Sequence, residues 1–298
     1  MITGGNIGNV DATTFYNPAT NEWSIGPQMA TGRGYHSMTP LRDGRVFTLG
    51  GSWSGGSFPK TAEVFNPITN SWKTYGGIRG GGSMLTEDDD GIFHADNHMW
   101  LFDAPNGLMF HAGPSHRMHW LDLNAGIDGN VTESVFRADD LHAMNGNAVM
   151  YEYGKILTLG GSKSYKGLDG VLPSRNAHVI NILGAERGGP EPTVMKVGSM
   201  KHRRCFANSV ILPSGEVLVV GGQAKVEVFA DSDAVFETEL WDPTTGNFTV
   251  LEELTLRIPR TYHSIALLMK DGRVITGGGG LCQVNCDYYS VNVSGWCK

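Results

Sequence analysis

Pairs of adjacent glycines recur along this chain of 298 residues, and each pair closes a short run of β-forming residues. The runs read RVFTLGG, KILTLGG, EVLVVGG and RVITGGG, and an earlier pair stands at Gly4-Gly5. The intervals between them are 46, 110, 61 and 56 residues. Because 110 is twice 55, we expect one degenerate unit in the long interval, with the stretch GLMFHAG near residue 110 as its remnant. The glycine pairs therefore predict a structural repeat.

A second phrase follows the glycine pairs and contains a proline turn. It reads TTFYNPATNEW at 13–23, AEVFNPITNSW at 62–72 and TELWDPTTGNF at 238–248. Proline presets the backbone angle φ of a turn, and the Asn or Asp before it caps that turn. Strand, glycine pair, strand, proline turn and closing aromatic, repeated about every 50 residues, are typical of a kelch propeller blade.

The repeat predicts an all-β fold, a kelch-type β-propeller, formed by residues 1–298 as one domain. A four-stranded blade cannot bury both of its faces alone, and packing blade on blade around an axis buries them. We count about four whole blades with partial ones at both ends, which is fewer than the six or seven expected for a closed kelch propeller. The chain opens inside a strand and stops without a closing strand pattern, so we expect it to be truncated at both ends.

Composition excludes some classes of function. The formal net charge is −7, and a nucleic-acid-binding surface would need clustered Lys and Arg. The sequence has no run of about 18 apolar residues, so we expect no membrane span. The first residues, MITGGNIGNV, lack the features of a signal peptide. Since function must be argued from a site and not from a fold, a binding module remains an alternative to an enzyme.

The four cysteines are Cys205, Cys282, Cys286 and Cys297. Cys282 and Cys286 stand four positions apart in the Gly-rich stretch GLCQVNC, where a local disulfide could form. A zinc site is the weaker alternative, because no second Cys or His pair with ligand spacing lies nearby.

Two segments far apart in the sequence share one phrase. GRGYHSMTPLRDGRVFTLGG begins at Gly32 and PRTYHSIALLMKDGRVITGGG begins at Pro259. The phrase places Tyr35 and Tyr262 at equivalent positions, each followed by a histidine. In a regular strand, adjacent Tyr262 and His263 would point to opposite faces. Both can serve one site only if they lie at a strand end or in a loop.

These segments resemble galactose oxidase and its copper radical oxidase relatives. The resemblance runs from TGGN at 3–6 to GGGGLC at 277–282. It includes GRGY at 32–35, DGRVFT and GGSWSGG within 43–56, DNH and WLF within 96–102, GNAVMY at 146–151, GKILT and GGS within 154–162, and YHSI at 262–265.

The resemblance implies one copper ion, two tyrosine ligands and histidine ligands. Tyr35 would be an equatorial ligand that carries a thioether bond to a cysteine and holds the radical. Tyr262 would be the axial ligand and candidate base, and His263 one imidazole ligand. Trp53 would stack over the ring of Tyr35. Imidazole and phenolate are ligands that suit Cu(II), and a basic tyrosine can take the proton of an alcohol. The adjacent His36 is expected to be structural, as are His116 and His119 in the stretch HRMHW.

The resemblance also implies an extracellular enzyme that oxidises primary alcohols to aldehydes while O2 is reduced to hydrogen peroxide. In the pocket, His94 and Asp90 would stand where galactose oxidase has an Arg and a Gln that hold sugar hydroxyls. Phe229 would be retained as an apolar wall and Tyr165 as a rim residue. Without the guanidinium clamp on a diol, we expect aryl or aliphatic primary alcohols as substrates in place of galactose.

The chain departs from the family in its ligand set. None of its cysteines matches the thioether partner of Tyr35, and the second histidine ligand of the family has no counterpart here. We therefore expect weak or no copper oxidase activity from residues 1–298 alone. The alternative is a non-catalytic kelch propeller that binds carbohydrate or protein.

Overall fold

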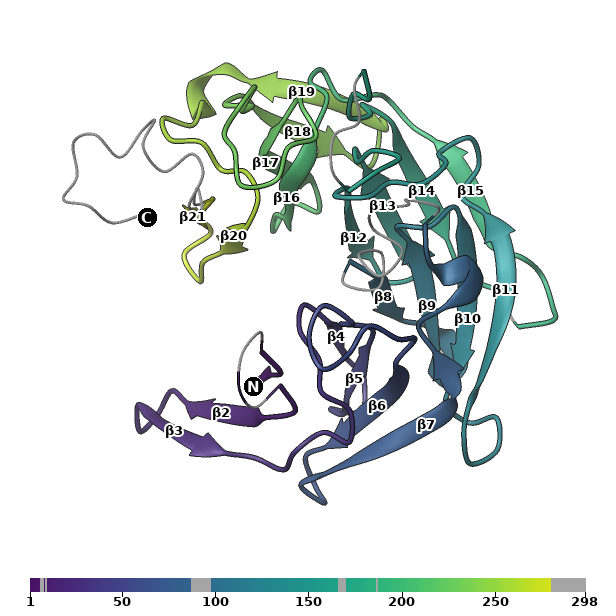
Figure 1. Cartoon of the computed structure of the whole chain (residues 1–298). Coiled ribbons are helices and arrows are strands. Elements are labelled where there is room, and N and C mark those ends of the chain that lie inside the picture. The colour runs from purple at the N-terminus through teal and green to yellow at the C-terminus, as the bar shows by residue number, and fades with distance from the viewer. Residues whose placement is uncertain (6–7, 9, 87–97, 166–169, 186, 280–298) are drawn as a thin grey trace. The chain divides into compact units, whose positions relative to one another are not determined.

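A computed structural model describes residues 1–5, 8, 10–86, 98–165, 170–185 and 187–279. The described residues form β-strands and three short 3₁₀ turns, and no helix among them is long and apolar enough to cross a membrane. The chain divides into two compact units (Figure 1). Unit 1 comprises residues 1–136 and 184–191, and unit 2 comprises residues 137–183 and 192–298.

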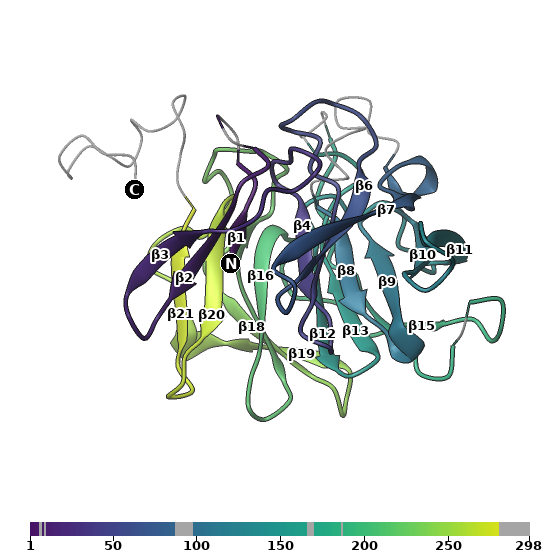
Figure 2. The same ribbon diagram turned by 90° about the horizontal axis from the view of Figure 1, so that it is seen from below.

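Unit 1 contains three antiparallel sheets whose strands follow chain order. The first has three strands, β1 (Ile2–Thr3), β2 (Thr13–Asn17) and β3 (Glu22–Ile25). The second has four, β4 (Ser37–Pro40), β5 (Val46–Leu49), β6 (Thr61–Asn66) and β7 (Ser71–Arg79). The third consists of β8 (Trp100–Asp103), β9 (Leu108–Gly113), β10 (Arg117–Asp122) and β11 (Asn130–Phe136). Figure 2 shows β4 and β8, the first strands of the last two sheets, side by side.

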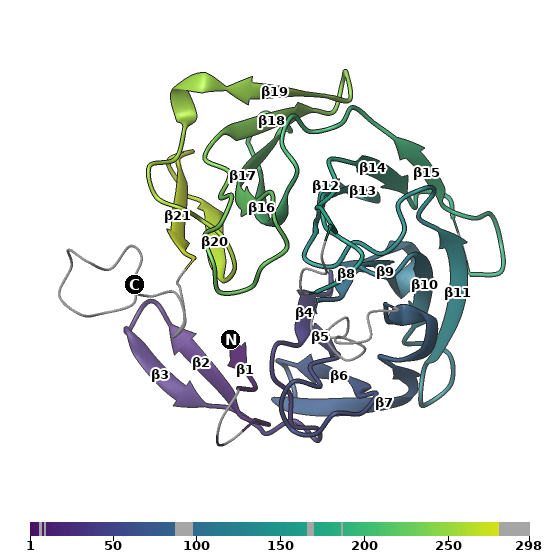
Figure 3. The ribbon, with the colours of Figure 1, turned by 45° about the horizontal axis from the view of Figure 1, so that its top comes forward.

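Unit 2 continues the same pattern. One sheet comprises β12 (Asn147–Glu152), β13 (Lys155–Leu159), β14 (Ala177–Asn181) and β15 (Thr193–Lys196). The next comprises β16 (Cys205–Ile211), β17 (Val217–Gln223), β18 (Thr238–Asp242) and β19 (Asn247–Leu251). A two-stranded sheet of β20 (Ser264–Leu268) and β21 (Val274–Gly278) follows. Figure 3 shows the β16–β19 sheet between the other two, and β16 contacts both β12 and β20.

Four of these sheets have the four antiparallel strands expected for a blade, and two smaller sheets lie before and after them in the sequence. The stretch GLMFHAG, expected to be the remnant of a degenerate unit, is strand β9 with its preceding residue in such a four-stranded sheet. Apolar side chains fill the space between consecutive sheets. Phe47 and Leu49 pack with Met109 and Leu121 in unit 1, and Leu157 packs with Val219 and Trp241 in unit 2.

The proline turns form as the sequence predicts. The side-chain oxygens of Asn17, Asn66 and Asp242 each accept a hydrogen bond from the backbone N–H two residues later, at 3.0, 2.9 and 2.7 Å. This is the Asx geometry that makes Asn and Asp favourable before a turn. The closing aromatics then lie opposite an aromatic on the neighbouring strand, in the pairs Tyr16 with Trp23, Phe65 with Trp72 and Trp241 with Phe248.

At three places in the described residues an arginine joins consecutive sheets, and we call this arrangement the arginine clasp. The backbone carbonyl of the arginine accepts a hydrogen bond from a glycine of the preceding sheet: Gly5 to Arg33 at 3.0 Å, Gly161 to Arg204 at 2.8 Å and Gly222 to Arg260 at 2.7 Å. Its guanidinium donates to a glycine carbonyl of its own sheet: Arg33 to Gly50 at 2.8 Å, Arg204 to Gly221 at 2.6 Å and Arg260 to Gly278 at 2.8 Å.

The clasp explains why glycine is needed. A Cβ atom on Gly160 would collide with the carbonyl oxygen of Arg204, and one on Gly221 would collide with that of Arg260. Both glycines also have positive φ, 63° and 67°, which residues with a side chain rarely adopt. The glycine pairs seen in the sequence are thus the points where one sheet meets the backbone of the next.

A buried ion pair completes two of the clasps. Arg33 lies 2.9 Å from Glu63, and Arg204 lies 2.9 Å from Glu239, with all four side chains fully buried. Each glutamate is on the third strand of the sheet that its arginine precedes. It also accepts two backbone hydrogen bonds from the chain just before the arginine, namely from Ala30 and Thr31 for Glu63, and from Lys201 and His202 for Glu239. A buried carboxylate is tolerated because its charge and its oxygens are satisfied in this way.

The Arg204 clasp reveals a third copy of the phrase shared by residues 32–51 and 259–279. Arg204 and Phe206 correspond to Arg33 and Tyr35, although the segment reads RRCFANS and lacks the Tyr-His pair. Sequence comparison alone had found two copies, because only the arginine and the glycines are essential to the clasp.

Removing one partner of the buried pair should therefore destabilise unit 2 strongly. We expect Glu239→Ala to lower the free energy of unfolding by about 3–5 kcal/mol, because the guanidinium of Arg204 stays buried without its counter-charge. Urea unfolding monitored by tryptophan fluorescence would measure the change.

Glu253→Ala, which alters an exposed glutamate, is the matched control and should change stability by less than about 0.5 kcal/mol. The double variant Arg204→Met/Glu239→Leu should recover only part of the loss, because it removes the unpaired charge but leaves the backbone N–H groups of Lys201 and His202 without their acceptor. A loss below about 1 kcal/mol for Glu239→Ala would contradict the structural role of the clasp.

Candidate functional site

Tyr262 and His263, two of the expected copper ligands, lie together in unit 2 just before strand β20. Their rings are stacked, with centroids 3.8 Å apart and an angle of 26° between the planes. His263 has a positive φ of 66°. This left-handed backbone interrupts the alternation of side chains in a strand, so both rings project to one side. The expectation that they stand at a strand end is confirmed, because β20 begins at Ser264.

Three other aromatic residues surround Tyr262. Phe206 and Phe229 approach it edge to face, with centroids 5.2 and 5.0 Å away. Phe229 also lies 5.7 Å from the ring of His263. The hydroxyl groups of Tyr165 and Tyr262 form a hydrogen bond of 2.5 Å. We call these five residues the aromatic cluster of unit 2.

The aromatic cluster brings Tyr165 and Phe229 of the expected substrate pocket next to the expected ligands. Phe229 borders both Tyr262 and His263, as an apolar wall would. Tyr165 was expected at a rim, but it is only 5% exposed and is bonded to Tyr262. It therefore belongs to the interior of the cluster. Phe206 had not been identified from the sequence, and its correspondence with Tyr35 in the clasp phrase is the signal that could have revealed it.

Tyr35 and Trp53 lie next to each other in unit 1. Gly34 forms a parallel β-bridge with Ser52, which holds the residues that follow each of them side by side. The two rings have centroids 6.1 Å apart and planes at 83°. Trp53 thus meets Tyr35 edge to face, and the stacked arrangement expected from the family resemblance is not the one found. A single β-bridge fixes the backbone but leaves the indole plane free to take this orientation.

The backbone at Tyr35 is also left-handed, with φ of 62°, and the side chain is 47% exposed. Its neighbour His36 turns away and forms a 2.7 Å hydrogen bond with the hydroxyl of Thr3. Burial, together with the nearby charges of Arg33 and Lys60, lowers the pKa of His36 to about 4. A neutral imidazole bonded to a hydroxyl agrees with the structural role expected for His36.

The residues of the aromatic cluster fit copper in their chemistry. Partial desolvation lowers the pKa of His263 below its ordinary value, which keeps the imidazole neutral and its nitrogen lone pair available to a metal. The phenol of Tyr262 is an oxygen donor beside it, and imidazole and phenolate both suit Cu(II). Within the described residues, no group of three or more His, Cys, Asp and Glu side chains could hold a metal.

Several expected residues lie outside the described part of the chain. They are His94 and Asp90 of the expected substrate pocket, and Cys282 and Cys286 of the expected disulfide. Among the described residues, the one cysteine is Cys205, a buried free thiol at the clasp of strand β16. Burial raises the pKa of this thiol far above its ordinary value.

Unit 1 contains a cluster of polar side chains that the sequence did not reveal. His119, expected from the sequence to be structural, lies on β10 directly opposite His111 on β9. Their Nδ1 atoms are 3.2 Å apart, and the Nε2 atom of His119 is 2.9 Å from the hydroxyl of Ser83. That hydroxyl donates to Glu133 at 2.7 Å. His116 instead stacks on Phe136, at 4.5 Å between centroids.

Comparisons with known proteins agree with these observations. A model of the kelch motif matches residues 41–76. Galactose oxidase of Gibberella zeae is 41% identical over 288 residues, which cover 95% of this chain and 41% of that protein. Aldehyde oxidase GLOX1 of Arabidopsis thaliana is 33% identical over 101 residues, 32% of this chain and 16% of that protein.

A solved structure of a fungal alcohol oxidase of the AA5 family, in complex with copper, matches 95% of this chain and 56% of its own with a TM-score of 0.84 and 36% identity. The resemblance to the galactose oxidase and copper radical oxidase family is confirmed, and with it the all-β kelch-type propeller fold. The chain spans less than half the length of the galactose oxidase and about half that of the solved oxidase.

The buried histidine pair predicts a pH-dependent stability of unit 1. Burial lowers the pKa of His119 to about 4, from an ordinary value of 6.5. The unfolded chain therefore binds a proton that the folded chain excludes, and stability should fall as the pH drops from about 6.5 to about 4. The loss should be about 3 kcal/mol for this residue, and unfolding in urea across this pH range would measure it.

His119→Gln should make the pH dependence shallower, whereas His116→Asn should leave it unchanged. An equally steep dependence in His119→Gln would exclude His119 as its source.

Proposed function

Because the chain is similar over 95% of its length to a galactose oxidase and to a copper-bound fungal alcohol oxidase, we propose that it supplies the propeller part of an extracellular copper radical oxidase. The reaction converts a primary alcohol to an aldehyde. The alcohol gives up two electrons and two protons, and O2 takes them to become hydrogen peroxide. The observation that carries the proposal is the stacked pair of Tyr262 and His263 inside the aromatic cluster.

Tyr262 and His263 would bind the copper ion in this proposal, and Tyr35 is a further ligand by family resemblance alone. Bound copper, paired with an oxidisable tyrosine, supplies a two-electron acceptor for the alcohol. Tyr35 would be the residue that carries the radical, and Trp53, which meets its ring edge to face, would shield that ring from solvent. The thioether cysteine and a further histidine ligand are not assigned to any residue of this chain.

Tyr262 would act as the base, and the structure gives it a partner for that role. Its hydroxyl is bonded to that of Tyr165, and either hydroxyl can be the donor. When Tyr262 is ionised, Tyr165 can donate to it and stabilise the anion. When Tyr262 takes the proton of the alcohol, it becomes a neutral hydroxyl that can donate a hydrogen bond to the oxygen of Tyr165. Phe206 and Phe229 cover the ring of Tyr262 edge to face and limit the access of water to it.

The substrate would be an aryl or aliphatic primary alcohol. Phe229 supplies an apolar surface beside Tyr262 and His263, and a flat apolar wall favours a hydrophobic substituent. His94 and Asp90 would replace the Arg and Gln that hold sugar hydroxyls in galactose oxidase, so a bidentate clamp on a diol is not expected.

A non-catalytic kelch propeller is the second candidate. The observation that favours it is the kelch motif match over residues 41–76, because a kelch fold alone does not imply catalysis. For residues 1–298 alone we expect weak copper binding and weak or no turnover, because two donors of the family are unassigned.

Copper titration of the purified chain tests the ligand assignment without relying on activity. We expect Cu(II) to give an electron paramagnetic resonance signal with nitrogen coupling and a tyrosinate-to-copper absorption band in the visible range. His263→Ala should weaken copper binding about tenfold or more, and Tyr262→Phe should weaken the absorption band. His202→Ala, which removes a histidine outside the aromatic cluster, should change neither. Unaltered copper binding in both site variants would exclude this site.

Substrate preference can be tested with the longest natural form of the protein loaded with copper. Hydrogen peroxide release should be faster with benzyl alcohol than with galactose. Phe229→Ala should lower kcat/KM for benzyl alcohol about tenfold, because the aryl ring loses its apolar wall. Faster turnover of galactose would refute the proposed substrate class, and release of no peroxide from any alcohol would favour the non-catalytic candidate.

A further inference from the structure

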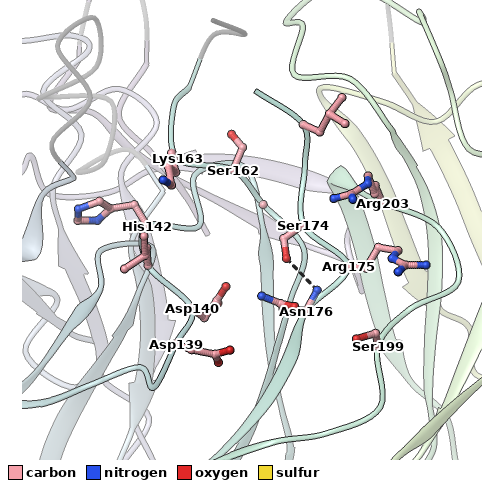
Figure 4. Close-up of a pocket in the computed structure, with 13 residues that line it drawn as sticks. Asp139, Asp140, His142, Ser162, Lys163, Ser174, Arg175, Asn176, Ser199 and Arg203 are labelled. Carbon is pink, nitrogen blue, oxygen red and sulfur yellow. Dashed lines mark hydrogen bonds between the residues drawn. The ribbon is translucent and has the colours of Figure 1, made fainter. Parts of the chain in front are cut away.

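Unit 2 contains a cavity of about 370 Å³ that includes none of the aromatic cluster. This volume is at the lower end of the range of small-molecule sites, about 300–1,000 Å³. Its wall is built by four segments, which precede β12, follow β13, precede β14 and precede β16. Most ligand pockets are lined mainly by apolar groups, whereas charged side chains, hydroxyls and an amide dominate this one (Figure 4).

The floor of the cavity is held in place by backbone hydrogen bonds. The segment 174–176 crosses it, and Figure 4 shows Asp139 and Asp140 on one side of this segment and Arg175 and Arg203 on the other. The N–H of Ser174 donates to Gly161 at 2.7 Å, and the carbonyl of Arg175 accepts from Met200 at 3.0 Å. The segment is therefore tied both to the glycine pair of its own sheet and to the chain leading into the next sheet.

The two carboxylates that face the cavity already have cationic partners. Asp139 accepts from Lys196 at 2.6 Å and from His178 at 2.8 Å. Asp140 lies 3.0 Å from the guanidinium of Arg137, which is fully buried. Their negative charge is therefore largely compensated by Lys196 and Arg137, which do not line the cavity. Their oxygens can still accept hydrogen bonds from a ligand.

The cationic side chains that line the cavity, unlike its carboxylates, are not compensated by a partner of opposite charge in the described part of the chain. Among the described residues, Lys163, Arg175 and Arg203 have no carboxylate within ion-pair distance. Arg203 is fixed by a hydrogen bond to the carbonyl of Pro173 at 3.0 Å. The hydroxyl of Ser174 accepts from the N–H of Asn176 at 2.8 Å (Figure 4), so its proton remains available to donate. Arg175 and Arg203 lie on one side of the segment 174–176, whereas Lys163 lies on the same side as the acceptors Asp139 and Asp140 (Figure 4).

We propose that this cavity binds a hydroxylated carboxylate of the sugar-acid class, with its carboxylate toward Arg175 and Arg203 and its hydroxyls toward Asp139 and Asp140. A planar guanidinium matches the two oxygens of a carboxylate. The acceptors on the far side of the segment match the hydroxyls of a sugar ring, which a simple anion would lack. This site is separate from the proposed oxidase site and does not depend on copper.

Calorimetric titration of the full chain with glucuronate tests this inference, with glucose as the neutral control. We expect measurable binding of glucuronate that weakens with added salt, because the cations are exposed, and at least tenfold weaker binding of glucose. Arg175→Ala, which removes an exposed arginine, should weaken glucuronate binding about tenfold. Arg257→Ala, which removes an exposed arginine outside the cavity, should not change it.

Three results would overturn the proposal. They are equal affinity for glucose and glucuronate, unchanged affinity in Arg175→Ala, and tighter binding of glucose 6-phosphate than of glucuronate. The last result would reassign the cavity to phosphorylated sugars. Acetate is a carboxylate without hydroxyl groups, so it tests the hydroxyl contacts. Acetate binding as tight as glucuronate binding would show that Asp139 and Asp140 contribute nothing.

Discussion

The arginine clasp is the contact on which the remaining structure depends. Each arginine accepts from a glycine of the sheet before it and donates to a glycine of the sheet that it opens. One residue thus sets the distance between two sheets and the register of the first strand. Because Arg33 and Arg204 are fully buried with Glu63 and Glu239, loss of one charge leaves the other buried without its counter-charge. The clasp is therefore a strict constraint, whereas the apolar contacts between sheets can tolerate substitutions of similar volume.

The clasp also determines where the aromatic side chains of the candidate site stand. Tyr35 and Phe206 each follow a clasp arginine by two positions, and both have a left-handed backbone. In the Arg260 copy the left-handed residue is His263, one position later. That shift by one residue places the rings of Tyr262 and His263 in parallel contact. The aromatic cluster thus arises from the same element that joins the sheets, with a small change of backbone in one copy.

The sequence predicted the features that depend on local chemistry. Glycine pairs and Asn-Pro or Asp-Pro turns constrain the backbone directly, so the repeat, the four-stranded sheets and the turn geometry follow from reading them. The copy at Arg204 was missed because its Tyr and His are replaced by Phe206 and Ala207, and the clasp itself tolerates that change. The edge-to-face contact of Trp53 with Tyr35, the pairing of His111 with His119 and the charged cavity depend on side chains from separate segments. No local pattern encodes those contacts.

The position two residues after the clasp arginine is a phenol in Tyr35 and a phenyl ring in Phe206. The backbone angle φ is nearly the same in both, 62° and 59°. The two side chains differ by one oxygen atom, and that atom decides whether the ring can ligate a metal or lose an electron readily. A substitution between Tyr and Phe at this position would therefore add or remove one oxygen donor while the backbone of the clasp stayed the same.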